Sequence, residues 1–414
     1  MRRAANAGAM LDAIREAADI GVHVLAPQVE TLFGAVMGSR SAFVDIARGG
    51  LFLDLGGGSV QMTWVDTRLQ MYEVAAALAG ESMPFGAARL IRVLEEEPAE
   101  IRSLEKRKLS ASLRGSFMSL CDKFPALKAL KESEHGIDVY LCGGGFRGYG
   151  SILMHTDPIQ PYPIPSMGSY TVPGHLFKRT KEMARVNDDA TGKIFGMSKR
   201  RRRQFPAILS VVEAFIDVVS NIRTATFCSG SNRDGSLMMS LPKAIRESNP
   251  LEVLANISEA DLPVVSAVME CIRGAVPQNV DISSTPTVFS LGLDRLFVEQ
   301  LWAGRGEDDD AHASFVLHDA MNRDSAAPGL THLTRAVLGL TTCARWGSGL
   351  GPIDAQLYNN LCGMVDAVDD QAVFWINYVG AVAAVIGILV PVWPKNADEI
   401  TKAVRYVSFF ETIC

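Results

Sequence analysis

The sequence predicts an α/β fold for roughly its first 245 residues and a mainly helical carboxyl-terminal part. Three short apolar runs, at residues 50–55, 137–142 and 224–228, are each followed at once by small residues, which is typical of strands that end in turns. From about Pro250 onwards the apolar residues recur with helical spacing. A chain of 414 residues has room for two or three domains, each with its own core.

The elements that lead to the first turn can be expected in order. A helical pattern opens the chain, a strand-like run follows at Val22–Ala26, and Pro27 then begins a helix that carries Glu30. The first apolar run, residues 50–55, pairs with residues 60–66 in a predicted β-hairpin. The turn of this hairpin is unusually rich in glycine.

The next elements alternate between helices and strands. A charge-rich helical stretch runs from Gly86 to Leu130, and its triple run Glu95–Glu97 is interpreted as a solvated face. A second glycine-rich loop is expected at Gly143–Gly148, and a third turn at Ser229–Gly235. Five prolines between Asp157 and Pro173 indicate a loop or a connection between lobes.

Charge limits the partners that the whole chain can attract. The formal net charge of -6 and the sequence pI near 5.7 give no general attraction to nucleic acid or to anionic lipid. A basic surface must therefore be local, and the run Lys199–Arg203 is one. It is most simply the solvated start of a helix; a nuclear-localisation signal and a track for polyphosphate stay open.

Cysteine usage predicts a reducing, intracellular environment, and we expect a cytoplasmic protein. The seven cysteines are far apart and form no Cys-x-x-Cys pair. The seven histidines do not combine with cysteines at zinc-ligand spacing, so a structural zinc is not expected.

The strongest chemical motif is the strand end Asp54 followed by Gly56-Gly57-Gly58-Ser59. Residues without Cβ let backbone N–H groups approach phosphate oxygens, while a carboxylate at the strand end can hold Mg²⁺ directly or through water. Three successive glycines exceed what a tight hairpin turn needs. We therefore predict a phosphate-binding loop with Mg²⁺ as the cofactor.

The second glycine-rich segment contains Gly143, Gly144, Gly145 and Arg147. Its spacing also fits the dinucleotide-binding pattern G-x-G-x-x-G, but that unit needs a helix behind the loop, and prolines follow here almost at once. We expect instead that both glycine segments face one cleft. The second would let a nucleotide or a phosphate chain pass close to the backbone, with Arg147 adding a charge-assisted contact.

Cleavage of a phosphoanhydride also requires a group that activates water, and Glu30 is the candidate. It lies in the first turn of the helix after Pro27. Spacing alone favours an ordinary first-turn glutamate that is stabilised by the helix dipole.

Several motifs in the first 241 residues together resemble the Ppx/GppA family of exopolyphosphatases and guanosine pentaphosphate phosphatases. Their positions are Arg2-Arg3-Ala4-Ala5-Asn6, Val24 to Gly38, Asp54 to Ser59, Met83 to Leu90, Gly143-Gly144-Gly145 and Asn232-Arg233-Asp234-Gly235. The resemblance implies an actin-like, ribonuclease H-like fold and places the proposed catalytic base on Glu30. It divides the chain into a remnant of a first lobe at 1–46, a second lobe at 47–245 and a helical, HD-like domain at 246–414.

The sequence Gly49–Trp64 and the long helical carboxyl-terminal part look most similar to the fungal retrograde-regulation branch of that family. This implies a second function: a non-catalytic ATP- or nucleotide-binding regulator of signalling from mitochondria to nucleus, with a signalling protein as partner. The sequence is compatible with an oligomer. It does not distinguish polyphosphate from a nucleotide as the ligand.

Departures from the family pattern bear on activity. The family pairs two glutamates where this chain has Val29 and Glu30, and often has Ser-Thr-Glu where this chain has Ser59-Val60-Gln61. The family's first phosphate loop would precede Met1. We therefore expect a truncated first lobe and weak or absent turnover of this chain.

Two features of the carboxyl-terminal part invite functional interpretations. His318-Asp319 forms the dipeptide of HD phosphohydrolases, with His312 and His332 nearby, but further ligands cannot be assigned. The uncharged run Ala372–Trp393 is long enough to span a membrane. We interpret it as a buried helix because prolines end it without basic anchors; a membrane anchor is the alternative.

Overall fold

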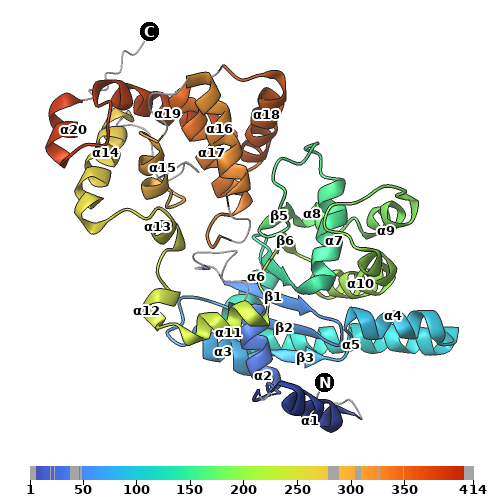
Figure 1. Cartoon of the computed structure of the whole chain (residues 1–414). Coiled ribbons are helices and arrows are strands. Elements are labelled where there is room, and N and C mark those ends of the chain that lie inside the picture. The colour runs from blue at the N-terminus through green and yellow to red at the C-terminus, as the bar shows by residue number, and fades with distance from the viewer. Residues whose placement is uncertain are drawn as a thin grey trace.

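The protein is described from a computed structural model. The described residues are 6–18, 20–22, 24–37, 46, 49–277, 289–303, 309–323, 327–347 and 349–404. A sheet covered by helices forms the amino-terminal part, and a cluster of helices forms the carboxyl-terminal part (Figure 1). The predicted α/β part followed by a helical part is therefore confirmed.

Six strands form one mixed sheet in the order β3-β2-β1-β4-β6-β5. The strands are β1 (Gly50–Leu55), β2 (Val60–Val65), β3 (Glu81–Met83), β4 (Ile137–Cys142), β5 (Tyr170–Pro173) and β6 (Ile222–Phe227). The central strands β1, β4 and β6 are parallel, whereas β2, β3 and β5 pair antiparallel with their neighbours. The predicted hairpin is confirmed, and its register pairs Leu55 with Val60.

One face of the sheet carries the larger core of this part. Leu51, Leu53 and Leu55 of β1 point to this face because side chains alternate along a strand, and all three are fully buried. Its cover includes α4 (Ala87–Glu96), α5 (Ala99–Lys123), α6 (Pro125–Glu132), α7 (Gly143–His155), α8 (Gly174–Phe177), α9 (Thr180–Asp189) and α10 (Lys199–Val218). Helix α10 begins at the basic run, with Ser198 as its N-cap, so the predicted helix start is confirmed.

The opposite face is covered by a smaller cluster. Phe52 and Tyr140, on adjacent strands, stack with their ring centroids 4.7 Å apart. The π-helical turn η1 (Leu32–Met37), which follows α2 (Pro27–Thr31), packs here with α3 (Tyr72–Ala79) and α11 (Asn232–Ser240). Helix α2 thereby lies against the sheet with the rest of this layer. Helix α1 (Ala7–Ala18) contributes no fully buried residue.

The helical part is organised around α17 (His332–Trp346), in which thirteen residues are buried. Its other elements are α13 (Pro250–Leu254), η3 (Glu259–Asp261), α14 (Leu262–Ala275), α15 (Asp294–Gln300), α16 (Asp309–Asn322), α18 (Pro352–Asp366), α19 (Ala372–Leu389) and α20 (Ala397–Ala403). The short helix α12 (Lys243–Arg246) lies where the chain passes from the sheet to this part (Figure 1).

Helix α19 is the one helix of the described chain that is long and apolar enough to cross a membrane, and half of its residues are buried. It packs closely on α17, since a Cβ at Gly380 would lie 2.5 Å from Ala344 Cβ. Its other side leaves Phe374 and Ile388 exposed. The expected burial therefore holds for the inward side of the helix.

The proline-rich segment between α7 and β5 connects the two parts by packing. The Tyr162 hydroxyl lies 2.7 Å from His332 Nδ1, and Asn360 Nδ2 donates to the Pro161 carbonyl at 2.8 Å. Ile164 is buried in the core of the helical part, and Tyr162 packs against both cores. The segment forms a loop, which is one of the two alternatives predicted for it, and it packs against both parts, whereas the chain itself passes between them near α12.

Two sequence-based predictions of local structure are wrong. The described residues of Val22–Ala26 form no strand, because this run has no neighbouring strand with which to pair. The predicted loop Gly143–Gly148 is the first part of helix α7, which continues to His155 before the prolines begin. Residues 1–5, 23, 38, 306–308 and 414, which belong to other predictions, lie outside the described residues.

Candidate functional site

The carboxyl ends of the parallel strands bring the three small-residue segments to one edge of the sheet. Asp54 at the end of β1 is paired in register with Cys142 at the end of β4. Cys228, just past β6, donates its N–H to the Leu141 carbonyl at 2.9 Å, which continues the same row. The ends of parallel strands are the common place for ligand sites in α/β sheets. The glycine turn, the start of α7 and the start of α11 therefore meet here.

The Gly56–Ser59 turn is anchored through its carbonyl groups. Ala87 N donates to the Gly56 carbonyl and Ala88 N to the Gly57 carbonyl, both at 3.0 Å, so the first turn of α4 holds the loop. Gly57 and Gly58 are exposed, and their N–H groups donate no hydrogen bond within the described chain. Gly86 makes this packing possible, because a Cβ there would overlap the backbone of Gly57 and Gly58. The turn thus presents two free N–H groups to solvent.

Asp54 is a largely buried carboxylate with a charged neighbour of each sign. Burial raises the pKa of Asp54 to about 6; Arg147 opposes this rise, and Glu30 adds to it. Glu30 on α2 and Arg147 on α7 therefore lie near enough to Asp54 on β1 for their charges to act on its carboxylate.

Arg147 also ties α7 to the segment after β6. Its Nη1 donates to the Ser229 carbonyl at 3.2 Å and to the Cys228 carbonyl at 3.4 Å. Both acceptors are neutral carbonyl groups, so these hydrogen bonds do not compensate the positive charge of the guanidinium. Arg147 is thus held in place as a cation at the site.

The three glycines at the start of α7 have different surroundings. Gly143 has φ of +86°, and a Cβ there would overlap Asp54 Oδ1. A Cβ at Gly145 would lie 2.5 Å from the Leu55 side chain, whereas Gly144 has more room, with Arg201 Nη2 at 3.9 Å. Gly143 and Gly145 therefore permit close packing of α7 on β1. Their predicted contact with a ligand stays a prediction.

Two residues from the family-like segments Val24–Gly38 and Asn232–Gly235, neither of which was predicted as a site residue, complete the surroundings of Asp54. A Cβ built on Gly34 of η1 would lie 2.5 Å from Asn232 Oδ1 and 2.8 Å from Asp54 Oδ2. Both side-chain oxygens thus crowd one point beside the backbone of η1. Asn232 is the first residue of α11, and its place at the start of a helix after a strand was the available signal.

The donor set around Asp54 suits Mg²⁺. The carboxylates of Asp54 and Glu30 and the amide oxygen of Asn232 are hard oxygen donors, and Mg²⁺ in phosphate sites commonly uses one or two carboxylates together with substrate oxygens and water. No group of three His, Cys, Asp or Glu side chains that could hold a metal occurs among the described residues. A cation here would therefore depend on ligand oxygens.

The HD dipeptide does not form a metal centre within the described chain. His318 Nε2 lies 2.7 Å from Asp354 Oδ1, and Ser314 Oγ donates to the other oxygen of Asp354 at 2.6 Å. His332 is instead buried beside Tyr162, and His312 is buried beside Trp346. The histidines are thus distributed among separate structural contacts.

Comparison with known protein families divides the chain at the same place as the fold. The model of the Ppx/GppA phosphatase family matches residues 1–244, which is more than half of the chain. The model of the RTG2 C-terminal domain matches residues 249–408. The first match ends within α12, and the second begins one residue before α13.

A curated relative extends over both parts. Retrograde regulation protein 2 of Saccharomyces cerevisiae is 27% identical over 400 residues, which cover 93% of this chain and 65% of that protein. The chain thus spans less than two thirds of the length of this relative.

Two solved structures are similar to a little more than half of this chain at low sequence identity. The Ppx/GppA phosphatase of Aquifex aeolicus is 15% identical, with a TM-score of 0.39, over 58% of this chain and 72% of that chain. An exopolyphosphatase from Cytophaga hutchinsonii is 20% identical, with a TM-score of 0.41, over 58% of this chain and 71% of that chain. On the family-model match over its first 244 residues, together with the sheet and motifs described above, this chain belongs to the Ppx/GppA phosphatase family.

Proposed function

We propose that this chain binds the phosphates of a polyphosphate or a nucleotide at the carboxyl edge of its sheet and acts as a regulator of the retrograde-regulation type. The observation that carries the proposal is the exposed backbone of Gly57 and Gly58 just after the strand end at Asp54, where the charges of Arg147 and Glu30 also act. The similarity to Retrograde regulation protein 2 over 93% of the chain supports the regulatory role.

The chain offers complementary groups for a phosphate ligand. The free N–H groups of Gly57 and Gly58 can donate to phosphate oxygens, as in other glycine-rich anion sites. Arg147 supplies a fixed positive charge, for which a charge-assisted bond to phosphate is about twice as strong as a neutral one. Asp54, with Asn232 beside it, would hold Mg²⁺, which neutralises phosphate charge when it is bound.

Hydrolysis is the second candidate function, and the position of Glu30 favours it. Glu30 is half-buried and close enough to Asp54 to raise the pKa of that carboxyl group. A carboxylate beside a bound phosphate chain can orient water and accept its proton. In this case the chain would be a phosphoanhydride hydrolase, and its regulatory output would follow the state of the ligand.

Binding and turnover can be measured separately on the purified chain. We would titrate it with inorganic polyphosphate and with ATP, each in the presence of Mg²⁺, and follow heat and phosphate release. We expect Asp54→Asn and Arg147→Gln to weaken binding at least tenfold, or about 1.4 kcal/mol. Glu97→Gln, an exposed carboxylate outside the site, is the matched control and should bind normally.

Three outcomes are informative. Phosphate release that is lost in Glu30→Gln while binding persists identifies the hydrolase. Binding without release by the unaltered chain identifies the non-catalytic regulator. If neither ligand binds, or if Glu97→Gln weakens binding as much as Arg147→Gln, the proposed ligand site is wrong.

The regulatory role carries further proposals about the cell. We propose a cytoplasmic location and a signalling protein as partner, since the charge of -6 and the cysteine pattern favour an intracellular protein without affinity for nucleic acid. Imaging of a tagged chain, together with extraction in the absence of detergent, tests this. Recovery only with detergent would favour membrane attachment through α19.

A further inference from the structure

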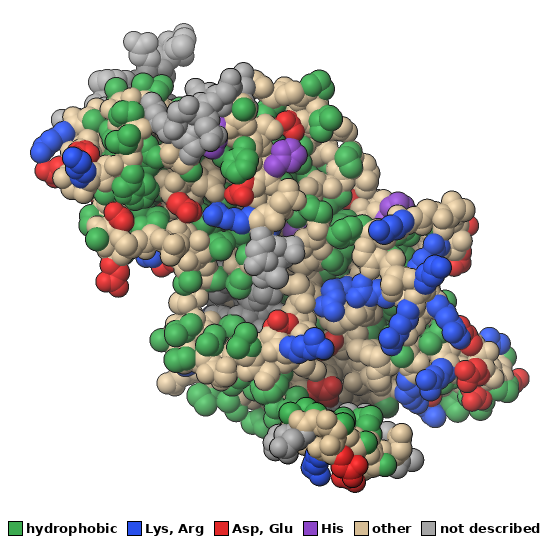
Figure 2. Space-filling model, in the orientation of Figure 1, with side chains coloured by type: hydrophobic (Ala, Val, Ile, Leu, Met, Phe, Trp, Pro, Cys, Tyr) green, Lys and Arg blue, Asp and Glu red, His purple; other side chains and the backbone are tan. Residues whose placement is uncertain are grey.

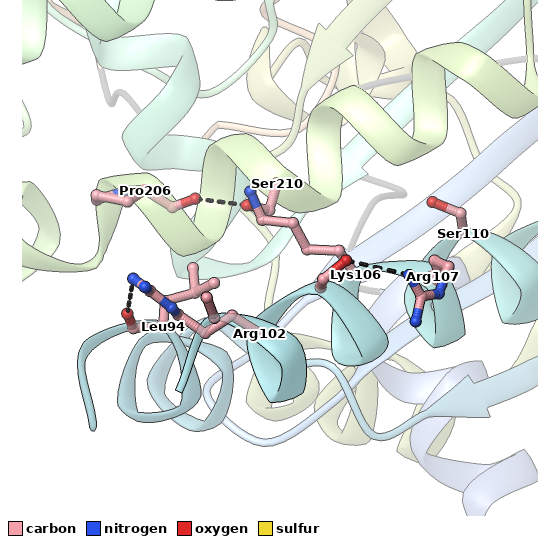
Figure 3. A pocket seen from close by; sticks show the side chains of 9 residues that line it. Leu94, Arg102, Lys106, Arg107, Ser110, Pro206 and Ser210 are labelled. Carbon is pink, nitrogen blue, oxygen red and sulfur yellow. Dashed lines mark hydrogen bonds between the residues drawn. The ribbon is translucent and has the colours of Figure 1, made fainter. Parts of the chain in front are cut away.

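An open groove runs along the outer surface between helices α5 and α10 (Figure 3). Its volume is about 730 Å³, and none of its nine lining residues is acidic. Lys and Arg side chains are frequent over the region of α10 and α4–α5, with Asp and Glu side chains beside them at its outer end (Figure 2). The groove uses no residue of the candidate phosphate site.

One stripe of α5 forms a wall of the groove. Its residues are Ala99, Arg102, Ser103, Lys106, Arg107 and Ser110. They recur at intervals of three and four, which places them on one face of the helix. From the first to the last the stripe rises about 16 Å, or three turns. The small side chains of the alanine and the serines leave a depression in this wall. The long side chains of Arg102, Lys106 and Arg107 line the depression.

The cations of this wall have no carboxylate partner among the described residues. Arg102 Nη1 donates to the Leu94 carbonyl at 3.5 Å, and Arg107 Nη1 donates to Ser103 Oγ at 3.1 Å. Two carboxylates close in sequence to this wall pair with other arginines: Glu95 with Arg203 and Glu105 with Arg89, each at 2.7 Å. The groove therefore concentrates positive charge that an anionic occupant would neutralise.

The second wall, on α10, is small and uncharged. Pro206 and Ser210 line it, and the Ser210 hydroxyl donates to the Pro206 carbonyl at 2.9 Å. Leu94 adds an apolar contact at one end. An occupant thus meets cations on one side and apolar or small groups on the other.

We propose that this groove seats an acidic amphipathic helix of a partner protein. The α5 wall is about three turns long and is hollowed by small residues, and α10 adds a shorter uncharged wall, so the groove can accept the ridge of a third helix. Carboxylates four residues apart on that helix would face Arg102 and Lys106, while its small apolar residues would face Pro206. The cations are spaced along α5 over about 8 Å and do not converge on one point, as a compact phosphate ligand would require.

A designed peptide tests the proposal directly. The probe is a fluorescent sixteen-residue helix with glutamates four residues apart beside an Ala/Leu stripe, and its twin has glutamine at each glutamate. Fluorescence anisotropy at low and moderate salt reports binding to the full chain. We expect the glutamate peptide to bind at least tenfold more tightly than the glutamine twin, with affinity falling as salt rises.

Charge reversal and steric filling locate the binding site. The triple variant Arg102→Glu, Lys106→Glu, Arg107→Glu should abolish binding. Its matched control, Lys108→Glu, Arg114→Glu, Lys123→Glu, changes the same charge at exposed positions on the same helix outside the groove and should bind normally. Ser103→Phe fills the groove without changing charge and should weaken the peptide at least fivefold, because a helix needs the hollow. Circular dichroism confirms folding of each variant.

The alternatives give different results. Equal loss in both triple variants would show diffuse electrostatic attraction and overturn the proposal. An unaffected Ser103→Phe variant, or absence of peptide binding, would overturn it too. Inorganic polyphosphate or a short DNA duplex that binds through the same cations, while the peptide does not, would assign the groove to a phosphate ligand instead.

Discussion

Gly143 lies with its backbone directly against the carboxylate of Asp54, at the point where β4 passes into α7. Its φ of +86° is a conformation that favours glycine, and a side chain there would overlap Asp54 Oδ1. The start of α7 and the strand-end carboxylate are therefore one packed unit. The absence of a Cβ at Gly143 is what leaves room for the Asp54 carboxylate in this position.

The first prediction is that Gly143→Ala destabilises the protein and disturbs the site. We expect a loss of about 1 to 3 kcal/mol in the free energy of unfolding, from a strained φ and from overpacking. Gly144→Ala is the matched control, because its Cβ meets nothing closer than Arg201 Nη2 at 3.9 Å. It should be neutral or slightly stabilising in urea unfolding. Equal losses in both variants would contradict the packing described here.

The second prediction concerns the pH dependence of Asp54. Burial raises its pKa from an unfolded value of 3.8 to about 6, so the folded protein holds this proton more tightly than the unfolded chain does. Stability should therefore fall as the pH rises from about 4 to 6, by an amount on the order of 2 to 3 kcal/mol. Asp54→Asn should be more stable than the unaltered chain at pH 7.5 and equal to it near pH 4. Urea unfolding in EDTA across this range tests both points.

The third prediction concerns the joint between the two parts. Burial, together with Arg335, lowers the pKa of His332 from 6.5 to about 3, so the neutral ring is the folded form. Stability should be lost as the pH falls below 6.5, by about 2 kcal/mol at pH 5. His332→Phe should lose this acid sensitivity. Tyr162→Phe removes the same 2.7 Å hydrogen bond, but this variant should keep the acid sensitivity because His332 stays buried. Acid sensitivity that survives in His332→Phe would assign it to another group.

The fourth prediction tests the packing of α19. A Cβ at Gly380 would lie 2.5 Å from Ala344 Cβ and 2.8 Å from the Thr341 carbonyl oxygen. Gly380→Ala should therefore cost about 1 to 3 kcal/mol, although alanine is the better helix former. Gly363→Ala on α18 meets only Ile159 Cδ1 at 3.7 Å and should stabilise by about 0.5 to 1 kcal/mol. Thermal unfolding distinguishes the two, and a neutral Gly380→Ala would argue against this helix contact.

The features that were predictable from sequence are those set by local patterns. Asp54 and the turn after it could be placed on a hairpin because apolar runs bracket three glycines, and the structure has that hairpin. The start of α10 was visible in the charge pattern of Lys199–Arg203. The run Val22–Ala26 shows the limit of such patterns, since a strand exists only where a neighbouring strand pairs with it.

The rest of the candidate site depends on contacts between distant segments. Gly34 and Asn232 are almost two hundred positions apart in sequence, yet they meet beside Asp54 because η1 and α11 cover the same face of the sheet. The glycine spacing at Gly143, followed closely by prolines, predicts a loop instead of a helix. Helix α7 in fact ends before the first of them.

Ile164 and Tyr162 have a consequence for dividing this protein into fragments. Both belong in sequence to the first 244 residues, yet Ile164 is buried in the core of the helical part and Tyr162 contacts it as well. A fragment that starts at residue 246 would lack both side chains and carry a hole in its interior, at a cost on the order of 2 to 5 kcal/mol for the isoleucine alone. The complementary fragment, which ends before residue 246, would expose the apolar side chains of Ile164 and Tyr162 to solvent. The two parts match separate family models, but neither is expected to be fully stable as an isolated fragment. Co-expression of the two fragments should restore the stability that each lacks alone.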